Sequence, residues 1–362
     1  MIGHILPTCA RQRRQAGFTM IELMVSIAIG LFLIAGLTSL MVASSVNSSE
    51  LNKTATEIEN GRYALQILSE DVQHAGFWGG YGAASTTLVA LPATLCGTTL
   101  ASLGFNAGTV TFPVGIYGFA GASSTPSCTP ALDHRIAGTD ILVVRRASTT
   151  AIPVASAAAN EFYIQVGNCA TVATPFVLDT NPASFTLTNK DCATASTIRK
   201  YMVHIYYLSS CNDCTSDTTP TLKVAEFVNG AFQITPLVEG IENLQIEYGI
   251  DTDGASADTS GAGAPDCYTS DPSAVPAAEA AACASAGYDL TTATPLVNWG
   301  NVVAARIHVL SRNLVPTAGW VDSRTYDLGL GVTAGPANDA YKRHAYSAVA
   351  RIYNIAGVRE SP

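Results

Sequence analysis

The sequence lacks the motifs that mark common catalytic sites. It contains no GxSxG motif, no glycine-rich nucleotide-binding loop and no carboxylate pair that stands out as an acid–base couple. Its histidines are scattered and show no HExxH or other metal-ligand spacing. Those that follow Gly17 are His74, His134, His204, His308 and His344. The sequence therefore predicts no catalytic residue, no metal site and no cofactor, and we expect a protein that is not an enzyme.

Basic residues are also scarce. The chain has 19 lysines and arginines against 28 aspartates and glutamates, which gives a formal net charge of −9 at pH 7. An acidic, lysine-poor body does not suit the polyanionic backbone of nucleic acid. We therefore expect no nucleic-acid partner.

Formal charge is absent from residues 23–49, between Glu22 and Glu50. Leu23–Ala43 is mostly Leu, Ile, Val, Met, Ala and Phe, and about 20 such residues span a bilayer as a helix. A secretory signal peptide is the first alternative, but its apolar core has only about 7–15 residues. Because arginines precede the run, the positive-inside rule places the N-terminus in the cytoplasm and the rest of the chain across the membrane. These arginines are Arg11, Arg13 and Arg14.

Glu22 is the unusual residue of this segment, because a carboxylate in a membrane helix costs roughly 2.5–3.5 kcal/mol on insertion scales. Residues 17–23 (GFTMIEL), with their arginine-rich leader, resemble the class III signal of type IV prepilins and type II secretion pseudopilins. The resemblance implies cleavage after Gly17 by a prepilin peptidase and N-methylation of the new amine on Phe18. It also implies that Glu22 pairs with the Phe18 ammonium of a neighbouring subunit. The alternative is an ordinary signal anchor with a glutamate near the membrane interface.

The helical period continues beyond the apolar run, through Glu50–Ala75. Residues at three- to four-residue steps form one mostly apolar stripe, typical of a helix that packs along one side. The stripe consists of Leu51, Ala55, Ile58, Arg62, Leu65, Leu68, Ser69, Val72 and Ala75. We expect one long helix over residues 18–76, spanning the membrane at about 20–43 and packed on a globular head beyond. Gly61 is a weak point, at about 1 kcal/mol relative to Ala, and two helices broken at Asn60-Gly61 are the alternative.

Gly76 supplies the stop signal of this helix. Phe77, Trp78 and Tyr81 follow it directly. We expect these aromatic residues to pack where the helix meets a sheet, rather than to form an exposed partner site.

The remainder of the chain is rich in Thr, Val, Tyr and Phe and is punctuated by turn residues, which indicates strands. The expected strands are Thr86–Leu91, Thr109–Phe119, Asp140–Arg146, Glu161–Val166, Ser184–Thr188, Ile198–Leu208, Leu222–Val228, Ala231–Pro236, Ile241–Ile250, Val302–Ser311 and Ala345–Ile355. Asn229-Gly230 is a two-residue hairpin turn. A helix is the alternative at Val302–Arg312. Residues 251–295 form an Ala-, Gly- and Asp-rich excursion with a short helix at Pro276–Ala286.

Eight cysteines follow Gly17, and eight allow 105 pairings. An even number outside the cytoplasm indicates disulfides, and pairing of sequential neighbours is favoured because short loops close more readily. The expected pairs are Cys96–Cys128, Cys169–Cys192, Cys211–Cys214 and Cys267–Cys283. A redox or zinc role for the CxxC spacing of Cys211 and Cys214 is the alternative. It is disfavoured because this motif follows a strand instead of opening a helix, and no second CxxC completes a zinc set.

Asp251-Thr252-Asp253-Gly254, with Asp258, resembles the opening of a calcium loop. The twelfth position of an EF-hand requires a glutamate, and here it is Ala262. An irregular calcium site therefore remains an alternative to an Asx-type turn that leaves the preceding strand.

Three further segments resemble the PilW family of minor pilins: Glu59–Gly79, Val238–Gly254 and Trp299–Ile307. The resemblance implies an α+β fold, in which the long pilin helix packs on a large, antiparallel, β-rich and disulfide-bonded head over residues 77–362. It also implies a structural subunit of the type IV pilus that primes assembly at the tip and supports twitching motility and adhesion.

The same resemblance implies the partners and the location. The partners are other minor pilins of the PilV, PilX and FimU kinds, a PilY-type tip adhesin, the major pilin, the prepilin peptidase and the inner-membrane assembly platform. The chain then crosses the cytoplasmic membrane once, with its head in the periplasm, before it moves to the pilus tip at the cell surface. A J-type minor pseudopilin of a type II secretion system and a membrane-anchored adhesin or enzyme are the alternatives.

Overall fold

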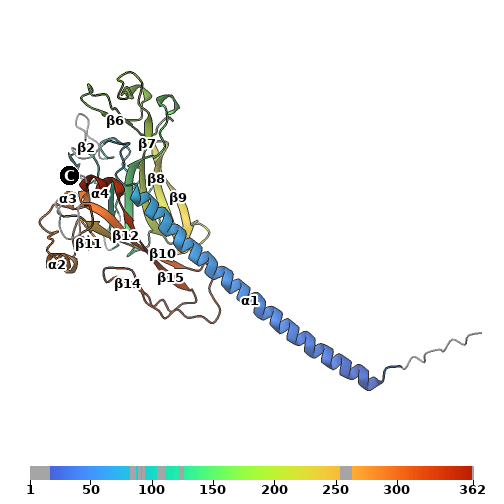
Figure 1. Cartoon of the computed structure of the whole chain (residues 1–362). Helices are drawn as coiled ribbons and strands as arrows, with labels where there is room; N and C mark the ends of the chain where they lie inside the picture. The colour runs from blue at the N-terminus through green and yellow to red at the C-terminus, as the bar shows by residue number, and fades with distance from the viewer. Residues whose placement is uncertain are drawn as a thin grey trace, which may run out of the picture. The chain divides into compact units, whose positions relative to one another are not determined.

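The computed structural model describes residues 17–81, 87–88, 91, 94–103, 111–121, 126–252 and 263–360 (Figure 1). It divides the chain into two compact units, Met1–Asn52 and Lys53–Pro362. We call the second unit the head. The arginine-rich leader lies outside the described residues.

Helix α1 covers Met20–Gln73 without interruption. The alternative of two helices broken at Asn60-Gly61 is therefore wrong. The structure starts and ends the helix inside the expected residues 18–76, and the chain turns at Gly76, where φ is +72°. A glycine reaches this left-handed conformation without the steric cost of a Cβ.

The first sheet of the head has seven strands, all antiparallel to their neighbours. They are β3 (Ile116–Phe119), β4 (Ile141–Ala147), β5 (Tyr163–Val166), β6 (Phe176–Asp179), β7 (Ile198–Ser209), β8 (Thr221–Val228) and β9 (Ala231–Glu239). The long strand β7 pairs with β4, with β5 near its start and with β8 near its end. Asn229-Gly230 turns the β8–β9 hairpin, with both residues at positive φ, as this turn requires.

The second sheet has four antiparallel strands in the order β11-β10-β12-β15. Their bounds are β10 (Ile241–Ile250), β11 (Cys267–Thr269), β12 (Val302–Arg312) and β15 (Arg343–Arg351). β12 pairs with β10 between Val302 and Ser311 and with β15 between Ala304 and Arg312, which rules out the alternative of a helix at Val302–Arg312. The α+β class predicted from the sequence is confirmed.

Short elements complete the described part of the head. They are β1 (Thr87–Leu88), β2 (Thr111–Phe112), β13 (Tyr326–Asp327), β14 (Thr333–Ala334), α2 (Ala277–Ser285), α3 (Pro295–Gly300), α4 (Tyr353–Arg359) and single 3₁₀ turns at Val154–Ser156 and Pro182–Ser184. α2 lies within the expected Pro276–Ala286. The described residues 263–295 of the excursion also contain β11 and the first residue of α3.

Three of the expected strands are wrong at least in part. Thr109–Phe119 is interrupted at residues 113–115, between β2 and β3, and its residues 109–110 lie outside the described residues. Ser184–Thr188 is not a strand, because Pro182–Ser184 forms a 3₁₀ turn capped by the Asn181 side chain. Ala345–Ile355 ends as a strand at Arg351 and continues as α4. Ile352, Tyr353 and Ile355 have a high strand propensity, so the local pattern did not mark this boundary.

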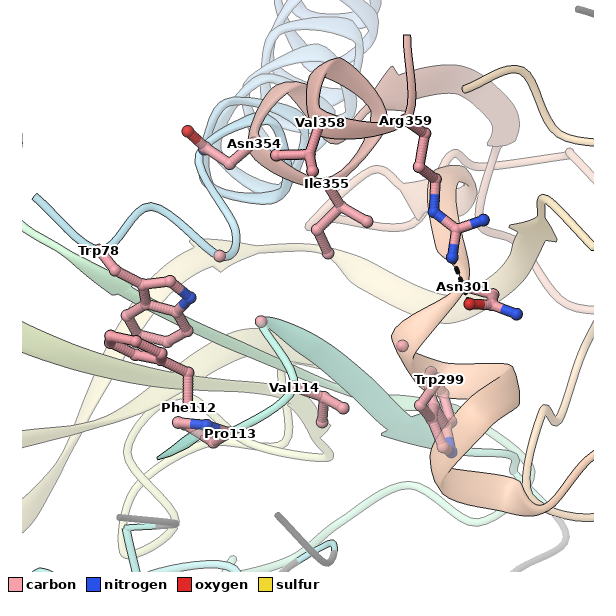
Figure 2. A pocket seen from close by; sticks show the side chains of 13 residues that line it. Trp78, Phe112, Pro113, Val114, Trp299, Asn301, Asn354, Ile355, Val358 and Arg359 are labelled. Atoms are coloured by element: carbon pink, nitrogen blue, oxygen red, sulfur yellow. Dashed lines mark hydrogen bonds between the residues drawn. The ribbon is translucent and has the colours of Figure 1, made fainter. Parts of the chain in front are cut away.

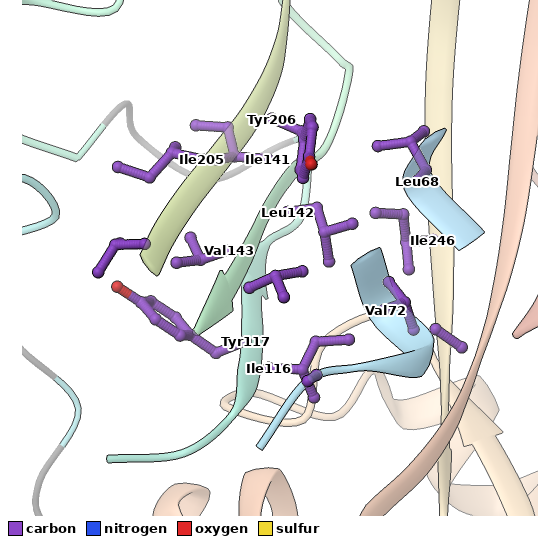
Figure 3. Packing of buried hydrophobic residues seen from close by; sticks show 14 of the residues in the cluster. Leu68, Val72, Ile116, Tyr117, Ile141, Leu142, Val143, Ile205, Tyr206 and Ile246 are labelled. Carbon is purple, nitrogen blue, oxygen red and sulfur yellow. The ribbon is translucent and has the colours of Figure 1, made fainter. Parts of the chain in front are cut away.

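The core lies where the last turns of α1 meet both sheets. Leu68 and Val72 of α1 point between Leu142 of the first sheet and Ile246 of the second (Figure 3). Asp140, at the start of β4, links the sheets, because its carboxylate accepts hydrogen bonds from the backbone amides of Gly121 and Ile246, each at 2.7 Å. The C-terminal part of α1 is thus an integral element of the head.

Candidate functional site

The N-terminal end of α1 is closed by a reciprocal pair of side chains. The Glu22 carboxylate accepts hydrogen bonds from the Thr19 backbone amide at 2.9 Å and from the Thr19 hydroxyl at 3.0 Å. In return, the Glu22 amide donates to Thr19 Oγ1 at 3.3 Å. This is a capping box, which satisfies amides that the first turn of a helix leaves unpaired. Its T-x-x-E signature is visible in the sequence, although Glu22 was expected only to pair with a neighbouring subunit.

The apolar run that follows presents its side chains to the surroundings. By length and composition α1 can cross a membrane, and no part of its most apolar window is buried within the described chain. Phe18, next to Gly17, is 85% exposed. Apolar surface of this extent requires a cover of lipid or other helices.

Within the head, the buried face of α1 agrees with the expected stripe at Leu68 and Val72 and departs from it at other positions. The buried residues are Glu57, Gly61, Ala64, Leu68, Asp71 and Val72. Leu51 and Ile58 of the expected stripe are exposed, at 71% and 40%. The face that contacts the sheets therefore combines small residues, two aliphatic residues and two carboxylates.

Asp71 is the centre of a buried polar cluster between α1 and the first sheet. Its carboxylate accepts hydrogen bonds from Arg146 Nε of β4 at 2.6 Å, from His204 of β7 at 2.7 Å and from the Tyr206 hydroxyl at 2.9 Å. Burial alone raises the pKa of Asp71, but His204 and Arg146 outweigh burial and lower this pKa to about 2. Asp71 is thus a charged group that fixes the helix to the sheet.

Glu57 makes the corresponding contact with the second sheet. Its Oε1 atom accepts a hydrogen bond from the Ser311 hydroxyl of β12 at 2.5 Å. Burial raises the pKa of Glu57. One turn further on, a Cβ at Gly61 would overlap the ring of Tyr346 of β15. Gly61, expected to be a weak point of the helix, is therefore a place where helix and sheet approach closely.

The aromatic exit of α1 packs as predicted. Trp78 is 4% exposed and stacks on Phe112, with ring centroids 5.3 Å apart. Trp78 and Phe112 also line a cavity of about 230 Å³, which Trp299 and Ile355 border on other sides (Figure 2).

The chemistry of this cavity is limited. Its lining is mostly apolar, and the Arg359 guanidinium at its edge is engaged by Asn301 (Figure 2) and by Asp251 at 3.2 Å. The described lining contains no general acid, general base or nucleophile, so it has no group that could catalyse a reaction.

The eight cysteines of the head form the four sequential pairs Cys96–Cys128, Cys169–Cys192, Cys211–Cys214 and Cys267–Cys283. Cys211–Cys214 closes a turn after β7, and Cys267–Cys283 joins β11 to α2. The redox and zinc alternatives for the CxxC motif lose support, because a metal requires thiolates. His134 lies within metal-ligand distance of Cys211 and Cys214, but both sulfurs are already bonded to each other.

The acidic loop after β10 is described only in part. Asp253, Gly254, Asp258 and Ala262 lie outside the described residues. Asp251 is fully buried, and its carboxylate pairs with Arg359 and accepts the Gly263 amide at 3.0 Å. The part of this loop that is described thus shows Asp251 engaged by protein groups.

Comparisons with known proteins find similarities over parts of the chain. The family model of type IV pilus-assembly protein W, PilW, matches residues 205–354, from β7 to α4. The prokaryotic N-terminal methylation motif matches residues 12–38. Among solved structures, a type IV-like pilin from Thermus thermophilus is similar at 10% identity with a TM-score of 0.27, covering 60% of this chain and 78% of that one. Among curated proteins, none matches the chain.

Proposed function

We propose that the chain is a structural subunit, a minor pilin of the type IV pilus tip, because residues 205–354 match the PilW model and residues 12–38 match the N-terminal methylation motif. In this role it joins the priming complex that initiates assembly and so supports twitching motility and adhesion. The observation that carries the proposal is the apolar run of α1, exposed along its length, with Glu22 at its start in register with the prepilin motif.

The maturation step follows from the same register. A prepilin peptidase removes residues 1–17 after Gly17, and the new N-terminal amine on Phe18 is methylated. Removal of the leader takes away Arg11, Arg13 and Arg14 and leaves 16 basic against 28 acidic residues. The mature chain then consists of a helix over residues 18–76, whose C-terminal part belongs to the head, and of the rest of the head over residues 77–362.

Glu22 then links the subunit to its neighbour. In the isolated chain its carboxylate is bonded to Thr19 and to no cation among the described residues. The Phe18 ammonium of an adjacent subunit supplies that cation, and pairing neutralises two charges that are costly apart in an apolar setting. The capping box holds the Glu22 carboxylate in place before the pairing occurs.

The size of the head favours the tip over the shaft. A shaft repeats one subunit many times and packs best with a compact head, whereas a tip subunit can carry two sheets and long connections. The proposed neighbours are minor pilins of the PilV, PilX and FimU kinds, a PilY-type adhesin and the major pilin. Before assembly, the chain is anchored in the cytoplasmic membrane with its head in the periplasm.

A genetic experiment tests the proposal. A strain with the gene deleted is complemented with the wild-type chain, with Glu22→Ala or with Glu59→Ala, and is scored for surface pili and twitching. Glu59 is an exposed glutamate of the same helix and serves as the matched control. We expect the deletion and Glu22→Ala to abolish or strongly reduce piliation, and Glu59→Ala to restore it. Normal piliation in the deletion strain contradicts the proposal, and a loss of protein secretion with normal pili favours the pseudopilin alternative.

A further inference from the structure

The connection between β12 and β15 carries an exposed aliphatic surface. Leu314, Val315 and Val321 are 37%, 54% and 63% exposed. They flank a turn in which the Trp320 amide donates to the carbonyl of Thr317 at 3.1 Å. We refer to residues 314–321 as the 314–321 loop. Exposed single aliphatic residues are common, but several on one short loop indicate a surface that is covered in use.

Cations surround this loop. Arg324 and Lys342 lie over the Trp320 ring, 5.4 and 5.7 Å from its centroid. Lys53 Nζ donates to the carbonyl of Pro316 at 3.1 Å. We call these three residues the basic rim. Arg324 also pairs with the buried carboxylate of Asp322 at 3.2 Å, so the basic rim and Asp322 together carry a formal charge of +2, in contrast to −9 for the whole chain.

The loop is held in a fixed shape. The Thr317 amide donates to the carbonyl of Ala340, and the Asp322 amide donates to the carbonyl of Asp339, each at 2.8 Å. Arg343 binds the carboxylates of both Asp322 and Asp339, at 3.1 and 2.6 Å. The exposed side chains are thus presented by a braced backbone, and docking requires little further ordering.

We propose that the 314–321 loop is a membrane-docking surface, which rests the head on an anionic lipid bilayer while the chain is anchored there. The inference depends on the membrane anchoring given under the proposed function. A tryptophan beside lysine and arginine with protruding aliphatic residues is the composition that binds the interface between headgroups and acyl chains. The basic rim supplies the attraction to anionic headgroups.

Charge and composition favour lipid over a second copy of this chain. Two copies that meet through this loop bring two basic rims together, and like charges repel. Lys53, which donates to the carbonyl of Pro316 in this loop, lies shortly after the apolar run in the sequence. The loop therefore contacts the part of the head that is joined to the expected membrane span. An acidic protein surface is the remaining occupant, and the experiment distinguishes it from lipid.

The test uses the full mature chain in vesicles of phosphatidylcholine with or without phosphatidylglycerol, each containing brominated lipid. Bromine quenches tryptophans at the membrane surface, and the other two tryptophans, Trp78 and Trp299, are 4% and 1% exposed. We expect quenching in wild type that Trp320→Phe removes and that phosphatidylglycerol strengthens. Val321→Asp is expected to reduce the quenching, whereas Val349→Asp, a valine of β15 that is 58% exposed, leaves it unchanged. Lys342→Gln is expected to lower the docked-to-undocked ratio by about fivefold.

The outcomes separate this inference from the proposed function. Flotation of the chain with the vesicles reports anchoring alone. Flotation with equal quenching in wild type and Trp320→Phe overturns the docking surface and leaves the anchoring intact. Hydrogen exchange of the 314–321 loop that slows only when other pilin subunits are added, and not in vesicles, identifies a protein interface and also overturns the inference.

Discussion

The cluster around Asp71 gives the sharpest test of how the helix is joined to the head. Asp71→Asn keeps the shape of the side chain but removes its charge, which leaves Arg146 and His204 without their buried carboxylate. Breaking a buried ion pair by removing one partner costs about 3–5 kcal/mol. The pKa provides a second figure: lowering it from 3.8 to about 2 corresponds to about 2–3 kcal/mol.

The pH dependence follows from the direction of that shift. The pKa of Asp71 in the folded chain lies below its value in the unfolded chain, which is about 3.9. The stabilisation is therefore fully present above about pH 4 and is lost as the pH falls toward 2. Asp71→Asn is expected to lower the free energy of unfolding by about 3 kcal/mol at neutral pH, and this loss shrinks between about pH 4 and pH 2.

Urea unfolding of the full mature chain in detergent micelles measures this effect over the pH range. Glu70→Gln is the matched control, because Glu70 is the neighbouring acid of the same helix but lies on its exposed face. It is expected to change the free energy of unfolding by less than about 0.5 kcal/mol. A loss of less than about 1 kcal/mol for Asp71→Asn at neutral pH, or a loss that does not change with pH, refutes the role given to this cluster.

Three further predictions concern the same unfolding measurement. Gly61→Ala is expected to lower the free energy of unfolding by about 1–3 kcal/mol, because the new Cβ meets the Tyr346 ring. A rise of about 1 kcal/mol, the value expected from helix propensity alone, contradicts the close approach of Gly61 to Tyr346. Glu57 has a raised pKa, so its ionisation lowers stability as the pH rises above about 4.3. The free energy of unfolding of Glu57→Gln is therefore expected to fall less between about pH 4.3 and neutral pH than that of wild type. An equal fall in both proteins contradicts the raised pKa of Glu57. Replacing Cys267 and Cys283 by serine removes a disulfide and is expected to cost about 3 kcal/mol; an unchanged unfolding midpoint makes that disulfide dispensable.

Local pattern in the sequence was sufficient for the long helix and for the strands from β7 to β10. These segments have a strong period and clear turn residues, of which Asn229-Gly230 is the best example. The cysteine pairs also followed from loop length. In each of these cases, the information lies within a short stretch of chain.

The buried face of α1 could not be predicted from the local sequence pattern. Glu57 and Asp71 are charged, so a hydrophobic pattern places them outside, and it placed Leu51 and Ile58 inside instead. Their burial depends on Ser311, His204 and Arg146, which lie on strands far away in the sequence. Gly61 has the same explanation, because Tyr346 makes it necessary. The Thr19–Glu22 capping box, in contrast, was readable from residue spacing alone.

The disulfides have a consequence for the order in which the head is made. In the proposed topology, the N-terminus stays in the cytoplasm and the head crosses the membrane in the order of its sequence, so its cysteines reach an oxidase one after another. Every native pair joins a cysteine to the next one in the sequence, from Cys96–Cys128 to Cys267–Cys283, with separations of 32, 23, 3 and 16 residues. Oxidation in order of arrival therefore yields the native pairs without reshuffling by an isomerase, even before β12 and β15 have emerged.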